Sequence, residues 1–433
     1  MFPGELSSGW MPGHTGGGMT VSGKSVLLLG VGMQGRVALH DLVQSPLVAE
    51  VVAVDANPQA RGLVEDQPGG KARFVCLDAS DREKVAGLMR RSDVVVELLP
   101  GSLAFPTAAL AASTGVSLIS SMYLYQPRGD SGPEDREFEH RLGLLDAEAK
   151  NKGITILPEF GLDPGIDLVC GMEAIRQLDE VHELLTYGAG IPQWVDASNP
   201  LRYKFSWSVA GLLNSYARPA QVIRGGKPVQ IPADRLFSPS HTHHLRLDAL
   251  EEPVECFANG DAVHYARMFG ITHTVKEAGR YTCRWAGHCA FWEKMAGAGF
   301  LSEAPVVTPS GPVKPLEFVA ALLSSQEQFN YGPTERDMAL VVVVARGIKH
   351  GRPLEITYQL IDRRDPATGF SAMSRTVGFP MSVGAQMILS GQIARHGVIT
   401  PMEVPVAPLL GELKRRGLDI RHSVAGWSGP VTH

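Results

Sequence analysis

The sequence predicts an α/β protein, with a doubly wound parallel sheet in its first part and a second domain of α+β type with a mixed sheet. Two patterns support this fold class. Between residues 24 and 158, short apolar runs alternate with segments of helix length, which is typical of parallel strands buried on both faces. Beyond residue 158 the alternating segments are longer and richer in proline and aromatic residues, which favours antiparallel or mixed strands.

The first elements form a single supersecondary unit. An apolar run at residues 25–29 predicts a buried strand, and a helical pattern at 36–43 and a second apolar strand at 50–54 follow it. Strand, glycine turn, helix and strand within about thirty residues indicate a βαβ unit. Further strands are expected at 73–77, 93–98, 116–120 and 154–157. Six strands predict a doubly wound, dinucleotide-binding domain over residues 24–158.

The second part carries three clear strands, at residues 183–187, 338–345 and 353–361. We expect them in a mixed sheet of a substrate-binding and dimerisation domain that spans residues 159–392. Its apolar strand at 339–345 favours a homodimer. Residues 1–23 contain neither a basic start nor an apolar run, so they are predicted to be a disordered tail and not a secretory signal.

The composition argues against several classes of protein. Forty Lys and Arg against 45 Asp and Glu give a net charge of −5 with no basic block, so no nucleic-acid partner is expected. No stretch of 18 residues is apolar and uncharged, so no membrane-spanning helix is expected. Five cysteines without a CxxC pair favour a reduced, cytoplasmic protein. The histidines at 241–244 lack further ligands at suitable spacing, which predicts a solvated loop and no metal site.

A glycine-rich loop, G-x-G-x-x-G, separates the first strand from the first helix. Gly30 permits a tight turn, Gly32 lets the backbone approach a pyrophosphate, and Gly35 allows the helix to pack closely on the strand. Asp55 follows Gly35 by 20 residues and ends the second strand, where it would bind the ribose hydroxyls and repel a 2′-phosphate. The loop therefore predicts NAD as the cofactor in preference to NADP, with a flavin or a methyl donor as alternatives.

Several longer segments resemble the saccharopine dehydrogenase family, which includes saccharopine reductases and lysine 6-dehydrogenase. They are residues 26–35, E-F-G-L-D-P-G-I-D at 159–167 and N-P-L-R-Y-K-F-S-W-S at 199–208, with looser similarity at 257–271, 280–288 and 397–403. The resemblance implies a Rossmann domain with a substrate and dimerisation domain inserted after its sixth strand. It also implies that a C-terminal segment, residues 393–433, returns to the first domain.

The resemblance further implies oxidation of a carbon–nitrogen bond by a nicotinamide cofactor. In the glutamate-forming members, hydride leaves the carbon that bears the secondary amine of saccharopine, and hydrolysis of the imine releases glutamate and 2-aminoadipate 6-semialdehyde, a step of lysine metabolism. The implied dinucleotide contacts are Gly30, Val31, Gly32, Met33, Gln34, Gly35, Val54, Asp55, Ala56, Asp78, Ala79, Leu99, Ser120, Ser121, Leu162, Asp163 and Trp207. The implied substrate contacts are Met122, Tyr123, Asp163, Thr282, Cys283 and Arg284.

Amine oxidation requires an unprotonated amine and a group that accepts its proton. Asp163 is expected to bind the amine and act as the base, and Tyr123 is expected to shuttle a proton. Lys204 is an alternative proton-transfer group. Arg284 is expected to hold a substrate carboxylate, because a guanidinium presents a bidentate fork and its neighbours in the sequence are aromatic.

The chain departs from the family at Gly260, where saccharopine-cleaving members carry an arginine that holds a substrate carboxylate. Either Arg202, Arg267 or Arg280 supplies the charge instead, or the substrate lacks that carboxylate, as lysine does. Saccharopine is therefore our first expectation, and lysine or a related carboxyalkyl amine is the second. A non-catalytic dinucleotide sensor is the alternative from a different functional class.

Overall fold

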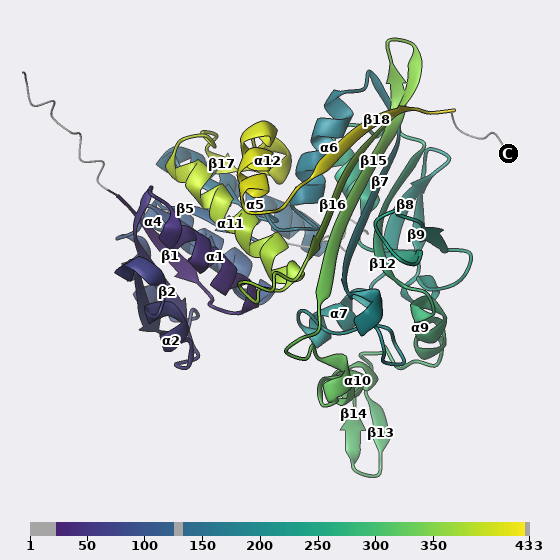
Figure 1. Ribbon diagram of the computed structural model, residues 1–433, viewed down its shortest axis with the longest axis horizontal. Coiled ribbons are helices and arrows are strands. Elements are labelled where there is room, and N and C mark those ends of the chain that lie inside the picture. The colour runs from purple at the N-terminus through teal and green to yellow at the C-terminus, as the bar shows by residue number, and fades with distance from the viewer. Residues whose placement is uncertain (1–22, 125–132, 429–433) are drawn as a thin grey trace, which may run out of the picture.

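The computed structural model describes residues 23–124 and 133–428, so residues 1–22 of the expected tail lie outside the described part. Two large sheets form two lobes, with the first sheet at the left of Figure 1 and the second at the right. The first sheet is parallel and the second is mixed, which confirms the predicted fold class. In the described part, no helix is long and apolar enough to cross a membrane.

The first sheet has seven parallel strands in the order β3-β2-β1-β4-β5-β6-β17. Its first six strands are β1 (Lys24–Leu29), β2 (Val48–Asp55), β3 (Ala72–Cys76), β4 (Val94–Glu97), β5 (Ser117–Ser120) and β6 (Thr155–Leu157). Its helices are α1 (Met33–Gln44), α2 (Ala60–Glu65), α3 (Arg82–Met89), α4 (Ala104–Thr114) and α5 (Pro133–Lys152). Leu27 and Leu28 pack into separate apolar clusters, which explains why this strand is a continuous apolar run.

The second sheet has nine strands, seven of them in the order β10-β11-β12-β7-β15-β16-β18, with β8 and β9 attached to β12. The strands are β7 (Glu180–Pro192), β8 (Ala220–Arg224), β9 (Lys227–Ile231), β10 (Thr242–Leu245), β11 (Val254–Ala258), β12 (Glu277–Trp285), β15 (Asp337–Lys349), β16 (Arg352–Arg363) and β18 (Arg421–Gly426). β12 and β7 are parallel, and the other strand pairs are antiparallel.

The expected solvated histidine loop is therefore partly wrong, because three of its residues lie in β10. His243 packs edge-on against Tyr281, with ring centroids 4.6 Å apart. Elements between the strands complete the second lobe: α6 (Ile166–Arg176), α7 (Val209–Tyr216), α8 (Ala262–Met268), α9 (His288–Gly297), α10 (Pro315–Ser324), and a hairpin of β13 (Val306–Thr308) and β14 (Gly311–Val313).

The chain returns to the first lobe earlier than residue 393, the boundary that we expected. Helix α11 (Ala372–Leu389) packs on α1 so closely that a Cβ atom at Gly378 would lie 2.6 Å from the carbonyl oxygen of Gln34. Fourteen of its 18 residues are buried, so other elements pack against several faces of this helix. β17 (Gly397–Val398) and α12 (Val406–Arg415) continue in the first lobe, whereas β18 crosses back to pair with β16.

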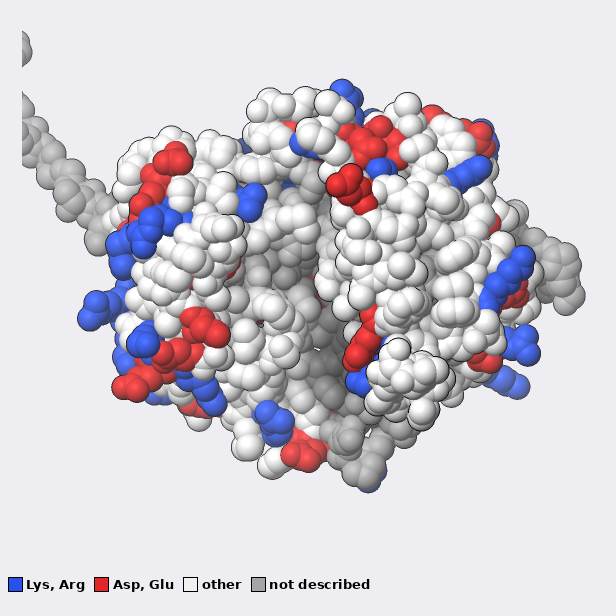
Figure 2. Space-filling view, turned by 90° about the horizontal axis from the view of Figure 1, so that it is seen from below, with Lys and Arg blue, Asp and Glu red and all other residues white. Residues whose placement is uncertain are grey.

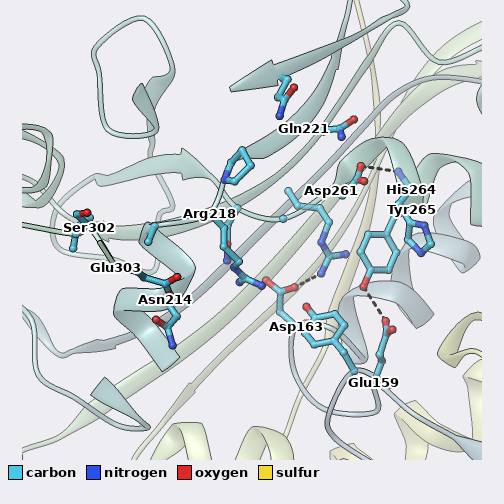
Figure 3. Close-up of a pocket in the computed structure, with 18 residues that line it drawn as sticks. Glu159, Asp163, Asn214, Arg218, Gln221, Asp261, His264, Tyr265, Ser302 and Glu303 are labelled. Atoms are coloured by element: carbon cyan, nitrogen blue, oxygen red, sulfur yellow. Dashed lines mark hydrogen bonds and ion pairs between the residues drawn. The ribbon is translucent and has the colours of Figure 1, made fainter. Parts of the chain in front are cut away.

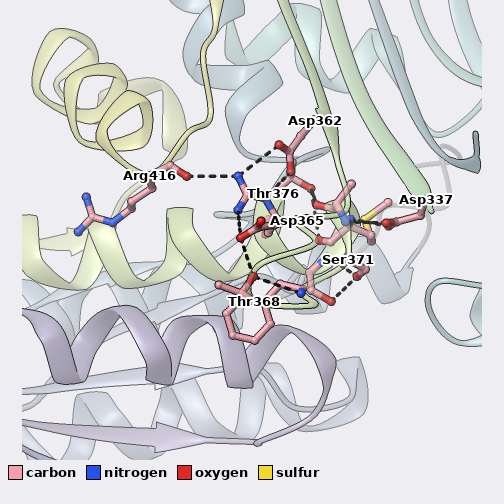
Figure 4. Close-up of polar contacts among 12 residues, drawn as sticks. Asp337, Asp362, Asp365, Thr368, Ser371, Thr376 and Arg416 are labelled. Carbon is pink, nitrogen blue, oxygen red and sulfur yellow. Dashed lines mark hydrogen bonds and ion pairs between the residues drawn. The ribbon is translucent and has the colours of Figure 1, made fainter. Parts of the chain in front are cut away.

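Buried polar contacts fix α11 to the second sheet (Figure 4). The Arg375 side chain donates from Nε to Asp362 at 2.8 Å and from Nη2 to the carbonyl oxygen of Arg416 at 3.2 Å. The Asp337 carboxylate accepts the first two backbone N–H groups of the helix, at 2.7 and 2.9 Å. Because these N–H groups have no partner inside the helix, Asp337 caps it.

Candidate active site

A groove separates the two lobes in the space-filling view (Figure 2). On the side of the second lobe, a cavity of about 870 Å³ extends to Tyr123, which follows β5 of the first sheet. The cavity is therefore bounded by both lobes. Its described lining is rich in charged and polar side chains, which include Glu159, Asp163, Asn214, Arg218, Gln221, Asp261, His264, Tyr265, Arg280 and Glu303 (Figure 3).

The predicted dinucleotide contacts of the first lobe gather at one edge of its sheet. Because the strands are parallel, the residues at and after their carboxyl ends meet at the same edge. Residues 30–35 follow β1, residues 54–56 lie at and just beyond the end of β2, residues 78–79 follow β3, Leu99 follows β4, and residues 120–121 lie at and just beyond the end of β5. The strand order reverses between β1 and β4, and ligands of open α/β sheets bind at such a point.

The glycine loop has the shape that a pyrophosphate requires. A Cβ atom at Gly35 would lie 2.1 Å from the carbonyl oxygen of Gly30, so the helix can approach the loop only without a side chain. A Cβ atom at Gly32 would meet nothing within 4 Å, which leaves open space above the loop. The N-cap residue of α1 is Gly32, which has no side chain to cap the helix, so the first N–H groups of α1 point toward the space in which an anion would bind.

Asp55 and Ser120 have partners within the first lobe. The Asp55 carboxylate accepts the backbone N–H of Val31 at 2.8 Å and that of Asn57 at 2.8 Å, so it is held beside the glycine loop. Ser120 has no exposed surface, and its hydroxyl donates to the buried Glu97 carboxylate. The Ser120 side chain therefore supports this edge of the sheet from within.

Arg280 of β12 is the centre of the charged cluster in the cavity. Its guanidinium forms an ion pair with Asp163 and another with Asp167 at 2.6 Å, and it stacks on the Tyr265 ring at 4.2 Å. Both carboxylates lie near the start of α6, just after β6. Burial raises the pKa of Asp167, although Arg280 opposes this effect. One buried cation thus orients two carboxylates from a different part of the chain.

Glu159 and two tyrosines extend this cluster. The Tyr265 hydroxyl donates to Glu159 at 2.8 Å, and burial raises the pKa of Glu159. Burial also raises the pKa of the Tyr123 hydroxyl well above its ordinary value, which keeps this hydroxyl protonated at neutral pH. Tyr123 and Asp163, both predicted from the sequence, are brought together in the cavity lining.

The other predicted substrate residues of β12 do not line the cavity among the described residues. Arg284 is buried, lies over the Tyr203 ring at 4.6 Å and donates to the Cys283 carbonyl oxygen at 2.8 Å. It is four residues beyond Arg280, which places it roughly 13 Å farther along the strand. Cys283 is buried with its Sγ 2.8 Å from that of Cys256. Thr282 accepts a hydrogen bond from the cavity residue Asn259 at 2.9 Å.

The structure also contradicts the prediction that Lys204 is an alternative proton-transfer group. Its side chain is buried and forms an ion pair with Glu335 at 2.8 Å, and it also donates to the carbonyl oxygen of Asn330 at 3.2 Å. These contacts hold Lys204 away from the cavity lining, so its predicted role in proton transfer has no geometric basis. Trp207, a predicted dinucleotide contact, lies just before α7 in the second lobe and is partly exposed.

Three further residues named in the sequence analysis, Leu162, Met122 and Gly260, contribute no side-chain contact to the Arg280 cluster among the contacts of the described residues. Leu162 is buried beside Asp163 in the chain, and the terminal methyl group of Met122 packs against Gly101. Gly260 does line the cavity, with a positive φ of 82° and no side chain to offer. Among the cations considered for its missing charge, Arg202 stacks on Trp194 at 4.9 Å, and Arg267 is exposed on α8.

Sequence reasoning gave no role to Asp167, Glu159 or Tyr265, and it considered Arg280 only as a replacement cation. Asp167 and Glu159 lie within the E-F-G-L-D-P-G-I-D segment. The family resemblance of this segment could therefore have pointed to these two carboxylates as well as to Asp163. Tyr265 and Arg280 come from α8 and β12. Only the tertiary fold brings them to this segment.

Family comparisons agree with this architecture. The family model described as saccharopine dehydrogenase C-terminal domain matches residues 161–418, and the one described as saccharopine dehydrogenase NADP binding domain matches residues 26–157. Bovine mitochondrial alpha-aminoadipic semialdehyde synthase is 28% identical over 91% of this chain. That match covers 47% of the bovine protein, so the chain spans about half the length of this relative.

Two further comparisons cover whole proteins. The saccharopine dehydrogenase [NADP(+), L-glutamate-forming] of Saccharomyces cerevisiae is 25% identical over 90% of this chain and 97% of its own length. The apo structure of the L-Glu-forming enzyme from that yeast covers 93% of this chain and all of its own, with 22% identity and a TM-score of 0.77. Homospermidine synthase from Legionella pneumophila, in complex with NAD, has a TM-score of 0.62 at 12% identity and covers 95% of this chain and 94% of its own. These structural likenesses show a shared fold.

Proposed function

Because the chain belongs to the saccharopine dehydrogenase family, we propose that it oxidises the carbon–nitrogen bond of a lysine-derived amino acid, with saccharopine as the first candidate. The products would be glutamate, 2-aminoadipate 6-semialdehyde and the reduced nucleotide. One observation carries the proposal: Asp163, which is ion-paired with Arg280, lines the same cavity as Tyr123 at the edge of the dinucleotide-binding sheet.

The charge of the cluster suits an amine substrate. Three carboxyl groups, those of Glu159, Asp163 and Asp167, lie around the guanidinium of Arg280. The Asp163 carboxylate lines the cavity and offers a negative charge to the secondary ammonium group of the substrate. We propose that Asp163, which faces the cavity, binds this nitrogen. The substrate nitrogen must lose its proton before the carbon–nitrogen bond is oxidised.

Glu159 is the second carboxylate that we assign to proton transfer. Burial raises its pKa, which makes it a better proton acceptor near neutral pH than an ordinary carboxylate. The Tyr265 hydroxyl binds one of its oxygens and leaves the other free of that contact. A bound pyridine nucleotide would accept the hydride, and the glycine loop with the N-terminus of α1 would hold its pyrophosphate. Water then completes the hydrolysis of the imine.

We propose NAD as the preferred nucleotide, although the family model and the yeast relative carry NADP in their names. The support is the Asp55 carboxylate, fixed beside the glycine loop by Val31, because its charge would repel a 2′-phosphate. Asp55→Asn keeps an acceptor for this hydrogen bond and removes the charge. We expect it to lower the ratio of kcat/KM for NAD to that for NADP at least about tenfold, a change of about 1.4 kcal/mol. An unchanged ratio would contradict the assignment.

The function is tested with the purified chain, NAD or NADP, and either saccharopine or lysine, by following the absorbance of the reduced nucleotide. Saccharopine should be oxidised with release of glutamate. Lysine is the second candidate because Gly260 offers no charge to the cavity, and its oxidation would release ammonia. Binding of nucleotide without turnover of either amine would favour a non-catalytic sensor.

We also propose a cytoplasmic homodimer. The five cysteines are all free, which supports a reducing compartment. Strand β18 is exposed along its whole length at the edge of the second sheet, and such an edge is available to pair with a second copy. Light scattering on the purified chain measures the oligomeric state, and a monomer at micromolar concentration would contradict the dimer.

A further inference from the structure

The cavity is lined by several acidic side chains, which would repel the carboxylates of its substrate. Glu159, Asp163, Asp261 and Glu303 all line the cavity. Saccharopine, the substrate of the proposed function on which this inference rests, brings further carboxylates into this acidic space. Desolvated like charges repel strongly, so binding requires a cation in the cavity wall.

Arg280 cannot serve as that cation. Its guanidinium already contacts the carboxylates of both Asp163 and Asp167 and stacks on Tyr265. If it turned toward a substrate carboxylate, it would leave Asp167, which has almost no exposed surface, without its counter-charge. Breaking a buried ion pair in this way costs several kcal/mol.

The other arginine in the described lining is Arg218. It lies in the short turn between α7 and β8. In Figure 3 its side chain extends from this wall toward Asp163. Asn214 and Gln221, which are close to Arg218 in the chain, also line the cavity, so this segment contributes further polar side chains to the wall.

We infer that Arg218 binds a carboxylate of the substrate that lies close to the reacting nitrogen, and that it thereby favours saccharopine over lysine. With the substrate nitrogen at Asp163, Arg218 faces whatever group is attached beside that nitrogen. In saccharopine the nitrogen is bonded to the α-carbon of the glutamate half, whose carboxylate is one carbon away. The ε-amine of lysine has no carboxylate nearby. The geometry of the wall therefore matches the glutamate half.

A guanidinium in this position also fits the product. After hydrolysis the nitrogen stays with glutamate as an α-amine, so Asp163 and Arg218 together would hold the amine and α-carboxylate of free glutamate. A bidentate arginine–carboxylate pair in a partly buried site is worth more than a neutral hydrogen bond, roughly 10- to 100-fold in affinity. Removal of the carboxylate from the ligand should cost the same factor.

The experiment compares glutamate with 4-aminobutyrate, which is glutamate without its α-carboxylate. Binding of each to the full chain with nucleotide present is measured by calorimetry, for the wild type, Arg218→Met and Arg218→Lys. Arg267→Met is the matched control, because Arg267 is exposed on α8 outside the described cavity lining. In parallel, KM is measured for saccharopine and for lysine.

We expect the wild type to bind glutamate at least about tenfold more tightly than 4-aminobutyrate. Arg218→Met should abolish this difference, Arg218→Lys should keep part of it, and the control should keep all of it. In the same series, Arg218→Met should raise KM for saccharopine roughly 10- to 100-fold and change KM for lysine less than about threefold. If Arg218→Met does not fold, Arg218→Lys alone carries the comparison.

The experiment distinguishes failure of the role proposed for Arg218 from failure of the proposed function. Wild-type chain that turns over saccharopine, with variants whose preference for glutamate is unchanged, overturns the role of Arg218 and leaves the proposed function standing. Wild-type chain that turns over neither amine overturns the proposed function. In that case the loss of glutamate preference in Arg218→Met would still support a carboxylate-binding role, and its retention would refute that role.

Discussion

Glu97 gives a direct test of how burial in the first lobe affects stability. It ends β4 with no exposed surface, its carboxylate accepts the backbone N–H of Leu99 at 2.8 Å, and the Ser120 hydroxyl donates to it. Burial outweighs these hydrogen bonds and raises the pKa of Glu97 from 4.5 to about 7. The folded protein therefore binds this proton more tightly than the unfolded chain does.

The raised pKa of Glu97 determines how the stability of the protein changes with pH. A group whose pKa is raised on folding contributes full stability below its unfolded pKa and loses that contribution as the pH rises through its folded pKa. With about 1.36 kcal/mol for each pKa unit, the whole loss is about 3 kcal/mol, of which roughly 2.5 kcal/mol falls between about pH 5 and about pH 8.5. This loss is the desolvation cost of an ionised, buried carboxylate.

Glu97→Gln removes the titration and keeps an oxygen that can accept the Leu99 N–H. The free energy of unfolding is measured from urea transitions, by circular dichroism, at several pH values. We expect the difference between variant and wild type to shift by roughly 2.5 kcal/mol in favour of the variant between about pH 5 and about pH 8.5. Glu83→Gln, at an exposed position on α3, should show no such shift. A difference that does not change with pH would refute the reasoning.

Two further substitutions test the loop and the charged cluster. Gly35→Ala places a methyl group 2.1 Å from the carbonyl oxygen of the first loop glycine; we expect a stability loss of about 1–3 kcal/mol and dinucleotide affinity reduced at least about tenfold, measured by calorimetry. Gly87→Ala on α3, where nothing lies within 4 Å, should leave affinity unchanged. Arg280→Met leaves Asp163 and Asp167 without their counter-charge, which should cost about 3–5 kcal/mol at neutral pH. Part of this loss should return at acidic pH as the carboxylates take up protons, and a pH-independent loss would contradict this explanation.

The first lobe could be predicted from the sequence because its signals are local. A strand buried on both faces must be apolar at every position, and the run before Gly30 meets that requirement in four consecutive residues, 26–29. The glycine loop adds a second local signal, since its spacing depends on contacts within six residues. The strand expected at 93–98 is found as β4, Val94–Glu97, with the difference confined to its ends.

The cavity was harder to predict because its contacts are not local. Arg280 and Arg284 lie on the same strand and have the same parity, so their side chains share a face of β12. The sequence pattern does not say which of the two meets a carboxylate. That choice depends on Asp163 and Asp167, which are more than 110 residues earlier in the chain and lie at the start of α6, just after the strand β6 of the first sheet. We expected Arg284 to hold a substrate carboxylate partly because its sequence neighbours are aromatic. Those neighbours indicate burial, and Arg284 is buried, but it is not among the described residues that line the cavity.

The crossings between the lobes explain how such distant residues keep a fixed geometry. Hydride transfer requires reacting atoms about 3–3.5 Å apart, yet the dinucleotide edge lies in one lobe and Arg218 and Arg280 lie in the other. Helix α11 bridges this gap, since it packs on α1 and is fastened to the second sheet through the Arg375 contacts. Arg416 donates to Asp41 of α1 at 2.6 Å, while its carbonyl oxygen accepts from Arg375. Arg416 thus ties α1 to the same arginine that pairs with Asp362 of the second sheet, and these linked contacts hold the second lobe against the edge where the nucleotide would bind.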